Sequence, residues 1–189
     1  TTFFPRRIPM SLVLRDIHKH FGPVHANDGI DLEIASGELH GLLGENGAGK
    51  STLMKVLSGF LTADSGSIEL DGKALPASSP RAALESGIGM LHQDPLVFLP
   101  FTVLDNFLLG APGGPFIDRK AGRRALADTA ARYGFSFDPD AQARSLTVGE
   151  RQQLEIARLL WRGARVLILD EPTTGISEPQ RIELFAVLR

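Results

Sequence analysis

The stretch GLLGENGAGKST, from Gly41 to Thr52, decides the fold. Within it, Gly44–Ser51 fits G-x-x-x-x-G-K-[ST], in which glycines let backbone N–H groups converge on a phosphate. The apolar run LHGLL precedes it and the amphipathic run STLMKVLSGF follows it. We therefore expect a strand over Leu39–Leu43 and, after the loop, a helix whose positive N-terminal end faces the same anion. The alternative, a glycine-rich turn with a chance lysine, is disfavoured by these flanking patterns.

The residues around this loop fit the chemistry of a nucleotide. The Lys50 ammonium is suited to bridge the β- and γ-phosphates, and the Ser51 hydroxyl is suited to ligate Mg²⁺. The residues predicted to bind the nucleotide in this loop are Gly44, Glu45, Asn46, Gly47, Ala48, Gly49, Lys50, Ser51 and Thr52.

A second acidic element follows in the run RVLILDEP. Its short continuous apolar part predicts a strand buried on both faces of a parallel sheet. Asp170, at the strand end, is expected to hold Mg²⁺ through water, and Glu171 to orient or deprotonate an attacking water. A surface acid pair that caps a strand is the alternative. No N-K-x-D tetrapeptide occurs, which disfavours a GTPase.

Composition sets the class of protein. The 189 residues carry a net charge of −2, 43% are hydrophobic and 22% are charged, as in globular domains. The near-neutral balance gives no broad electrostatic footprint for nucleic acid. Because cysteine is absent, a disulfide scaffold and thiolate metal sites are excluded. No apolar stretch approaches the roughly 20 residues of a membrane-spanning helix.

The chain changes character near Gln93. Before it, Leu12–Asp71 reads as strands, with an alternating segment around Ile30 and a hairpin turn at Asp71–Gly72. After it, TVLDNFLL and RKAGRRALADTAARYG read as helices. The sequence therefore predicts an α/β core with an inserted helical lobe. Basic residues of the second helix are read as a solvated face rather than a nucleic-acid patch: Arg119, Lys120, Arg123, Arg124 and Arg132.

A further helix is predicted to begin at the segment LTVGE. Thr147 and Glu150 form a capping box, and the apolar residues Leu154, Ile156, Leu159 and Leu160 follow at inward positions. With Gly149 in its first turn, this N-terminus is a second candidate anion-binding end. It cannot serve the phosphates of the first loop without crowding, so it is expected to serve the nucleotide of a second subunit.

Together these residues resemble an ATP-binding cassette (ABC) ATPase from about Leu12 to the end of the chain. GENGAGKST resembles the Walker A motif, VLILDE the Walker B motif, Gln93 the Q-loop, and Phe21 the aromatic that stacks on adenine. LTVGE resembles the family signature Leu-Ser-Gly-Gly-Gln, from which Thr147, Val148 and Glu150 depart while Gly149 is kept. The resemblance implies ATP with Mg²⁺ as ligands, and hydrolysis with Lys50, Gln93 and Glu171 as catalytic residues.

The resemblance also implies an architecture. It is an α/β fold with a P-loop NTPase core (mostly parallel sheet), an antiparallel β subdomain and an inserted α-helical subdomain. The expected boundaries are 1–11 for a leader or tail, 12–93 and 162–189 for the core with the β subdomain, and 94–161 for the helical subdomain. Two cassettes pair head to tail. ATP is held by Phe21 and the Lys50 loop of one and by Thr147, Gly149 and Glu150 of the other, and Ser51, Gln93 and Asp170 hold the metal.

Segments such as SPRAALESGIGMLHQ resemble the ATPases of simple-sugar and nucleoside importers, whose cassettes occur as tandem pairs in one chain. The chain is then the first cassette, peripheral to the cytoplasmic face of the cell membrane. Its partners are the second cassette, membrane permease subunits and, indirectly, a substrate-binding protein, with no nucleic acid. Two alternatives are a soluble ABC protein outside transport, and an inactive truncated cassette that binds ATP without hydrolysing it.

Two departures from the family pattern stand out. Ser177 occupies the position of the usual D-loop acid, and its capping box with Gln180 keeps the helix cap while the carboxylate is lost. The chain stops at Arg189, before the family's strand that ends in the switch histidine. The expectation is a fragment with unpaired strand groups in its core. None of its histidines can replace the switch residue, because His18, His20, His25, His40 and His92 all precede Asp170.

Overall fold

A computed structural model describes residues 11–75, 79–111, 118–172, 178, 181–182 and 185. The chain divides into two compact units, residues 1–86 and 87–189, which are taken separately below. The expected leader or tail, apart from Ser11, and the Ser177 cap lie outside the described residues. Among the helices that are described, none has the length and apolar character needed to cross a membrane.

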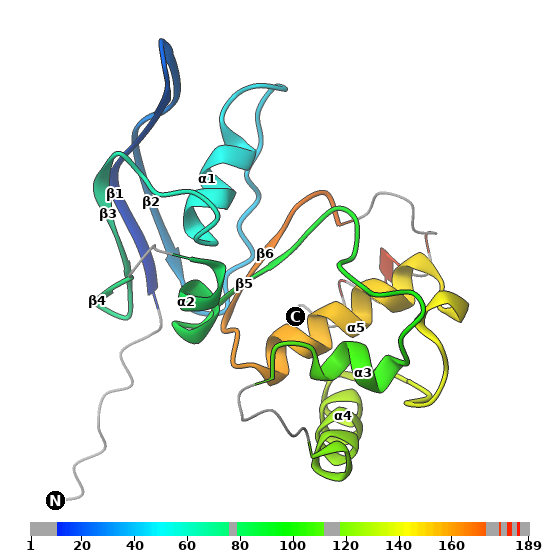
Figure 1. The fold of residues 1–189 in the computed structure, drawn as a ribbon. Helices are drawn as coiled ribbons and strands as arrows, with labels where there is room; N and C mark the ends of the chain where they lie inside the picture. Colours follow the sequence, from blue (N-terminus) through cyan, green and yellow to red (C-terminus); the bar gives the residue numbers. More distant parts are fainter. Residues whose placement is uncertain are drawn as a thin grey trace, which may run out of the picture. The chain divides into compact units, whose positions relative to one another are not determined.

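The first unit is built on an antiparallel sheet of order β2-β1-β3-β4 (Figure 1). The predicted alternation in β2 is confirmed, because Ile30, Leu32 and Ile34 are half-buried while Asp31 and Glu33 are exposed. Two short helices complete the unit. The bounds are β1 Ser11–Phe21, β2 Val24–Ala35, α1 Lys50–Leu57, β3 Ser65–Leu70, β4 Lys73–Ala74 and α2 Pro80–Glu85.

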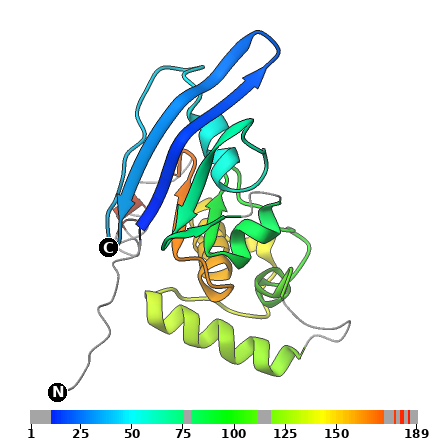
Figure 2. The ribbon, with the colours of Figure 1, turned by 90° about the vertical axis from the view of Figure 1, so that its left-hand side faces the viewer.

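The β1–β2 hairpin extends beyond strand β3, which pairs with the other edge of β1, as Figure 2 shows. Strand β3 pairs with β1 only as far as His18, whereas the β1–β2 ladder continues to the pair Phe21–Val24. At the opposite end of β3, the predicted turn at Asp71–Gly72 is confirmed. Both turn residues have positive φ, 55° and 72°, as a two-residue hairpin turn of type I′ requires.

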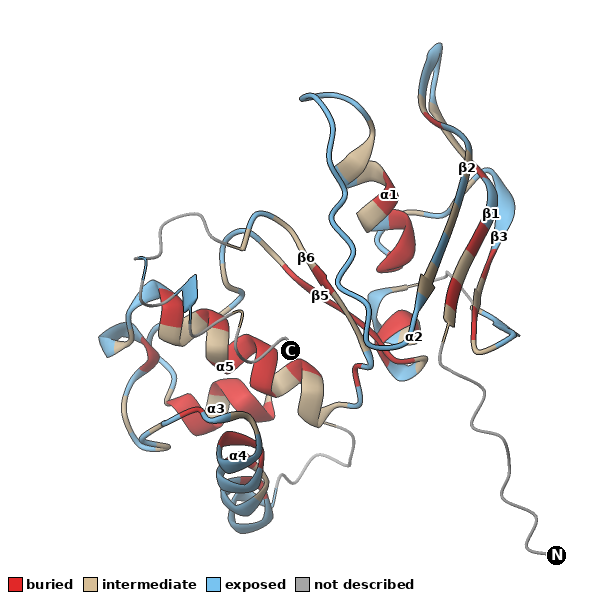
Figure 3. Ribbon diagram, turned by 180° about the vertical axis from the view of Figure 1, so that it is seen from behind, coloured by how far each residue is buried: buried red, intermediate tan, exposed pale blue. Residues whose placement is uncertain are grey.

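The second unit packs three helices beside a pair of parallel strands, β5 and β6. Figure 3 shows the buried residues concentrated where α3, α4 and α5 meet. Phe107 and Trp161 stack there, with ring centroids 4.6 Å apart. The bounds are β5 Ile88–Leu91, α3 Val103–Leu108, α4 Arg119–Tyr133, a 3₁₀ turn η1 Ala143–Ser145, α5 Val148–Trp161 and β6 Val166–Leu169.

The predicted helices after Gln93 are confirmed. Asp118 caps α4 by accepting hydrogen bonds from the amides of Lys120 and Ala121, and Gly134 ends this helix at a φ of 73°. The basic residues of α4 are exposed. Two of them pair with acids, Arg119 with Asp105 and Arg123 with Asp140, as expected of a solvated face.

Two strand predictions need correction. Residues Leu39–Leu43 form no strand, and Leu39 and Leu43 are 69% and 92% exposed. A strand needs a ladder partner, and the described strands pair only among themselves in two other sheets. In β6, only Ile168 is buried, and its other residues are half-buried. The reason is that the described part of this sheet has only two strands, so β6 is covered less than a central strand.

Helix α1, which confirms the predicted helix after the glycine loop, starts at a close backbone approach to β2. Gly49, its N-cap, has a φ of 82°, and a Cβ atom there would lie 1.9 Å from the Ala26 carbonyl oxygen. The Asn27 side-chain amide donates a hydrogen bond to the Gly49 carbonyl at 3.2 Å. Gly47 also has positive φ, 85°, but its missing Cβ would meet nothing within 4 Å. Position 49 is therefore restricted to glycine by contact as well as by dihedral angle.

We expect Gly49→Ala to lower the free energy of unfolding by at least about 1 kcal/mol more than Gly47→Ala does. Both variants place alanine at positive φ, a shared cost on the order of 1–2 kcal/mol. Only Gly49→Ala adds a collision with a backbone carbonyl. Urea unfolding of the parent protein and both variants measures the difference. Equal losses would show that the approach to Ala26 does not constrain α1.

Candidate functional site

The glycine loop folds around the lysine that follows it. The Lys50 ammonium donates hydrogen bonds to the carbonyl oxygens of Gly44 at 2.6 Å and Glu45 at 2.7 Å. Within the loop, the amide of Ala48 donates to the same Glu45 carbonyl at 3.2 Å. The loop carbonyls thus hold one cation, the ammonium of Lys50, the first residue of α1.

The N-terminal end of α1 is open to an anion. Its N-cap is Gly49, which has no side chain to accept a hydrogen bond, and no acidic residue lies in the first turn. Residues 44–48 and Ser51 are exposed, and Gly49 and Lys50 are half-buried, so the loop and the start of the helix are accessible to an anion. The helix dipole adds partial positive charge at the same place. The residues present therefore fit a phosphate group.

Phe21 lies at the tip of the β1–β2 hairpin and is 48% exposed. The Lys19 ammonium lies 5.7 Å from the centroid of its ring, close enough for a cation–π interaction. Figures 1 and 2 both show this hairpin tip at the same end of the unit as the loop before α1. An exposed aromatic ring at this end suits the predicted stacking on a base.

In the second unit, the structure brings Gln93 and the acidic pair to one edge. Strands β5 and β6 are parallel, with Leu91 beside Leu169, and the amide of Asp170 donates to the Leu91 carbonyl at 3.2 Å. The carboxyl ends of parallel strands lie at the same edge of a sheet. The segments that carry Gln93, Asp170 and Glu171 therefore leave the sheet at this shared edge.

The two acids and Gln93 differ in their surroundings. Gln93 and Glu171 are exposed, whereas Asp170 is half-buried. Glu171 has a φ of 47°, in the left-handed region that residues other than glycine rarely adopt. Strain of this kind concentrates at functional sites. This backbone conformation turns the chain sharply directly after β6.

The predicted capping box at α5 is confirmed. The amide of Glu150 donates to the Thr147 hydroxyl oxygen at 3.3 Å, and the Glu150 carboxylate accepts from the Thr147 amide at 2.7 Å. The Thr147 hydroxyl also donates to this carboxylate at 2.9 Å. Gly149 is buried in the first turn. Unlike the end of α1, this helix end already carries a negative charge.

Sequence reasoning missed an ion pair that fastens the chain after Gln93 to α5. The Glu155 carboxylate accepts a hydrogen bond from the Leu96 amide at 2.9 Å and lies 3.3 Å from the Arg158 guanidinium. Arg158 in turn donates to the Leu96 carbonyl. Burial raises the pKa of Glu155 and lowers the pKa of Arg158, while their mutual attraction opposes both shifts. The only signal in the sequence was an acid and an arginine three positions apart on the apolar side of a helix.

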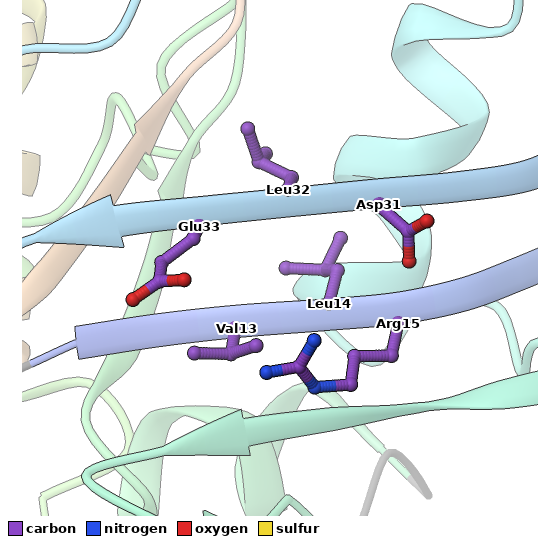
Figure 4. A pocket seen from close by; sticks show the side chains of 6 residues that line it. All are labelled: Val13, Leu14, Arg15, Asp31, Leu32 and Glu33. Carbon is purple, nitrogen blue, oxygen red and sulfur yellow. The ribbon is translucent and has the colours of Figure 1, made fainter.

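A hollow of about 200 Å³ lies over strands β1 and β2 (Figure 4). It is lined by Val13, Leu14, Arg15, Asp31, Leu32 and Glu33. None of these is a predicted site residue. The phosphate loop belongs to the first unit, and Gln93, Asp170 and Glu171 belong to the second. That both sets of residues bind the same nucleotide stays a prediction.

Comparison with known proteins finds relatives that are described as import ATP-binding proteins. The chain is 43% identical over 176 residues to the nucleoside import ATP-binding protein NupA of Lactococcus lactis, covering 92% of this chain and 35% of that protein. It is 43% identical over 182 residues to the ribose import ATP-binding protein RbsA of Chromobacterium violaceum, covering 95% and 36%. The chain thus spans about a third of the length of these curated relatives.

Solved structures agree with the fold. The chain superimposes on cbiO1 from Clostridium perfringens, described as part of the ABC transporter complex cbiONQ, with a TM-score of 0.78 and 30% identity, covering 94% of this chain and 71% of that one. The ADP conformation of MJ1267, an ATP-binding cassette of an ABC transporter, gives a TM-score of 0.82 at 27% identity, covering 95% and 75%.

The family profile described as "ABC transporter" matches residues 27–174. That range begins in β2, includes the glycine loop, and ends beyond the acidic pair. The chain therefore belongs to the ABC transporter family.

Proposed function

We propose that this chain is the ATP-binding and ATP-hydrolysing cassette of an importer for a sugar or nucleoside. The observation that carries the proposal is the open end of α1, where no side chain caps the first-turn amides and the loop carbonyls hold the Lys50 ammonium. Family membership supports it. The relatives named above are import ATP-binding proteins for a nucleoside and for ribose, which supports this substrate class.

In this proposal the chain's residues divide the work of binding. The Lys50 ammonium exchanges its loop carbonyls for phosphate oxygens, the α1 amides hold the adjacent phosphate, and Phe21 stacks on adenine. Ser51, Gln93 and Asp170 offer the oxygen atoms that Mg²⁺ prefers. Mg²⁺, when bound, neutralises charge on the phosphates.

Hydrolysis is assigned to the carboxyl edge of β5 and β6. Glu171 accepts a proton from the attacking water, and its left-handed backbone fixes where the side chain leaves the strand. Gln93 lies at the same edge and senses the γ-phosphate. The Glu155–Arg158 pair fastens Leu96, three residues after Gln93, to α5, which suits transmission of that signal to the signature helix.

The start of α5 is proposed to face a second cassette, paired head to tail in the full-length protein. Thr147 and Gly149 would approach the nucleotide held by the partner's phosphate loop. The resemblance implies that Glu150 also holds this ATP, but its carboxylate accepts a hydrogen bond from the Thr147 amide and its negative charge repels a phosphate. We therefore infer that the start of α5 binds ATP more weakly with glutamate at position 150 than it would with glutamine at that position.

A membrane permease is the proposed partner of the segment after Gln93. Four large apolar side chains are exposed within a few residues of one another, Leu96, Phe98, Leu99 and Phe101. Phe98 and Phe101 also stack, with centroids 5.4 Å apart. Clustered exposed apolar side chains mark interaction surfaces. This placement puts the chain on the cytoplasmic face of the membrane, with a substrate-binding protein acting through the permease.

We expect Glu171→Gln, made in the full-length protein, to reduce ATP hydrolysis by about 10²-fold or more. Because glutamine keeps the size of the side chain but accepts no proton, ATP binding is retained and the ATP-bound pair of cassettes accumulates. Steady-state phosphate release and size-exclusion chromatography with ATP measure both effects. Glu33→Gln, at an exposed acid on β2, is the control. Unimpaired turnover in Glu171→Gln would remove Glu171 from this role.

We expect Glu150→Gln to strengthen ATP-dependent pairing of the cassettes several-fold, on the order of 1 kcal/mol. Glutamine keeps the cap on the Thr147 amide but removes the negative charge. Glu150→Ala is the matched control, because it removes the charge and the cap together. The ATP concentration at half-maximal pairing measures the change. A weaker interaction in Glu150→Gln would mean that the carboxylate aids the site.

A further inference from the structure

Three histidines converge on the β1–β2 hairpin. His18 and His20 lie two residues apart on β1, a spacing that places side chains on one face. His25 on β2 is the cross-strand partner of His20. The ring centroids of His20 and His25 lie 4.3 Å apart, and those of His18 and His20 lie 6.0 Å apart.

Carboxylates surround these rings. Asp28 lies 3.0 Å from the Nδ1 atom of His18 and 4.0 Å from that of His25. Asp16 lies 2.9 Å from the Nε2 atom of His18. Asp64 lies 3.7 Å from the Nδ1 atom of His20, and 2.7 Å from the Lys19 ammonium. The hairpin therefore gathers imidazole nitrogens and carboxylate oxygens in one place.

We propose that His18, His20 and Asp28 form a binding site for a transition-metal dication of the Zn²⁺ class, with His25 as the fourth ligand. One donor atom from each of the first three residues lies within 4.8 Å of the others. Ligand atoms of a tetrahedral zinc ion lie about 3.3 Å apart, given bond lengths of about 2.0–2.1 Å. Small side-chain rotations on a fixed backbone close that gap.

The state of the two β1 histidines favours a ligand. The Nε2 atom of His20 is shielded from solvent and makes no hydrogen bond to any described residue, a costly state for a polar atom. Both ring nitrogens of His18 face carboxylate oxygens. A metal ion at this cluster binds the Nδ1 atom of His18 and the Asp28 carboxylate, which already lie 3.0 Å apart.

The donor set selects the class of ion. Imidazole nitrogens suit Zn²⁺, Ni²⁺ and Cu²⁺, whereas Mg²⁺ and Ca²⁺ prefer oxygen ligands. The hairpin also offers a fixed platform, because the His20 amide donates to Asp64 at 2.6 Å. None of the proposed ligands is itself a predicted nucleotide-binding residue, but His20 directly precedes Phe21, so metal binding is measured without nucleotide.

The test uses the full-length protein, stripped of metal with a chelator and titrated with Co²⁺ and Zn²⁺ without nucleotide and with Mg²⁺ in excess. We expect a visible absorption band typical of tetrahedral cobalt, and its displacement by Zn²⁺. His20→Gln and His18→Gln should each weaken binding about tenfold or more. His40→Gln, at an exposed histidine outside the cluster, should change nothing. Circular dichroism of each variant separates loss of the site from loss of the fold.

Two results would overturn the proposal: no tetrahedral cobalt band in the parent protein, or the same affinity and stoichiometry in folded His20→Gln.

Discussion

The close approach of Gly49 to the Ala26 carbonyl is the constraint on which the candidate phosphate site depends. It fixes where α1 begins relative to β2, and hence where the free amides of its first turn point. It also leaves the N-cap without a side chain, so no hydroxyl or carboxylate competes with an external anion. One glycine thereby provides both the backbone contact and the open helix end, and Lys50 follows at once.

Helices α1 and α5, which both begin near predicted phosphate contacts, treat their positive N-terminal ends in opposite ways. Helix α1 leaves its positive end open, while α5 satisfies its own end with Thr147 and Glu150. A helix dipole alone therefore does not make an anion site, because a capping carboxylate cancels much of the charge that attracts a phosphate. The change from glutamine to glutamate in the signature therefore adds a negative charge at the helix end that is predicted to face a phosphate.

Local patterns predicted local structure well. The alternation around Ile30, the turn at Asp71–Gly72 and the capping box at Thr147 all depend on neighbours within a few residues, and all three are confirmed. Predictions that needed a distant partner fared worse. The strand over Leu39–Leu43 lacks a ladder among the described residues. The hydrogen bond from the Leu96 amide to Glu155 and the contact between His18 and Asp28 depend on packing and strand register. A single sequence does not reveal either.

Equilibrium binding of MgATP to the full-length protein tests the central claim most directly. The account predicts that Lys50→Ala weakens MgATP binding at least about tenfold, because the hydrogen bonds of a charged ammonium are lost. Lys73→Ala, at an exposed lysine of β4, should leave the affinity unchanged. Equal affinity in Lys50→Ala and the parent protein would contradict the account, because the loop and α1 would then not hold the phosphates.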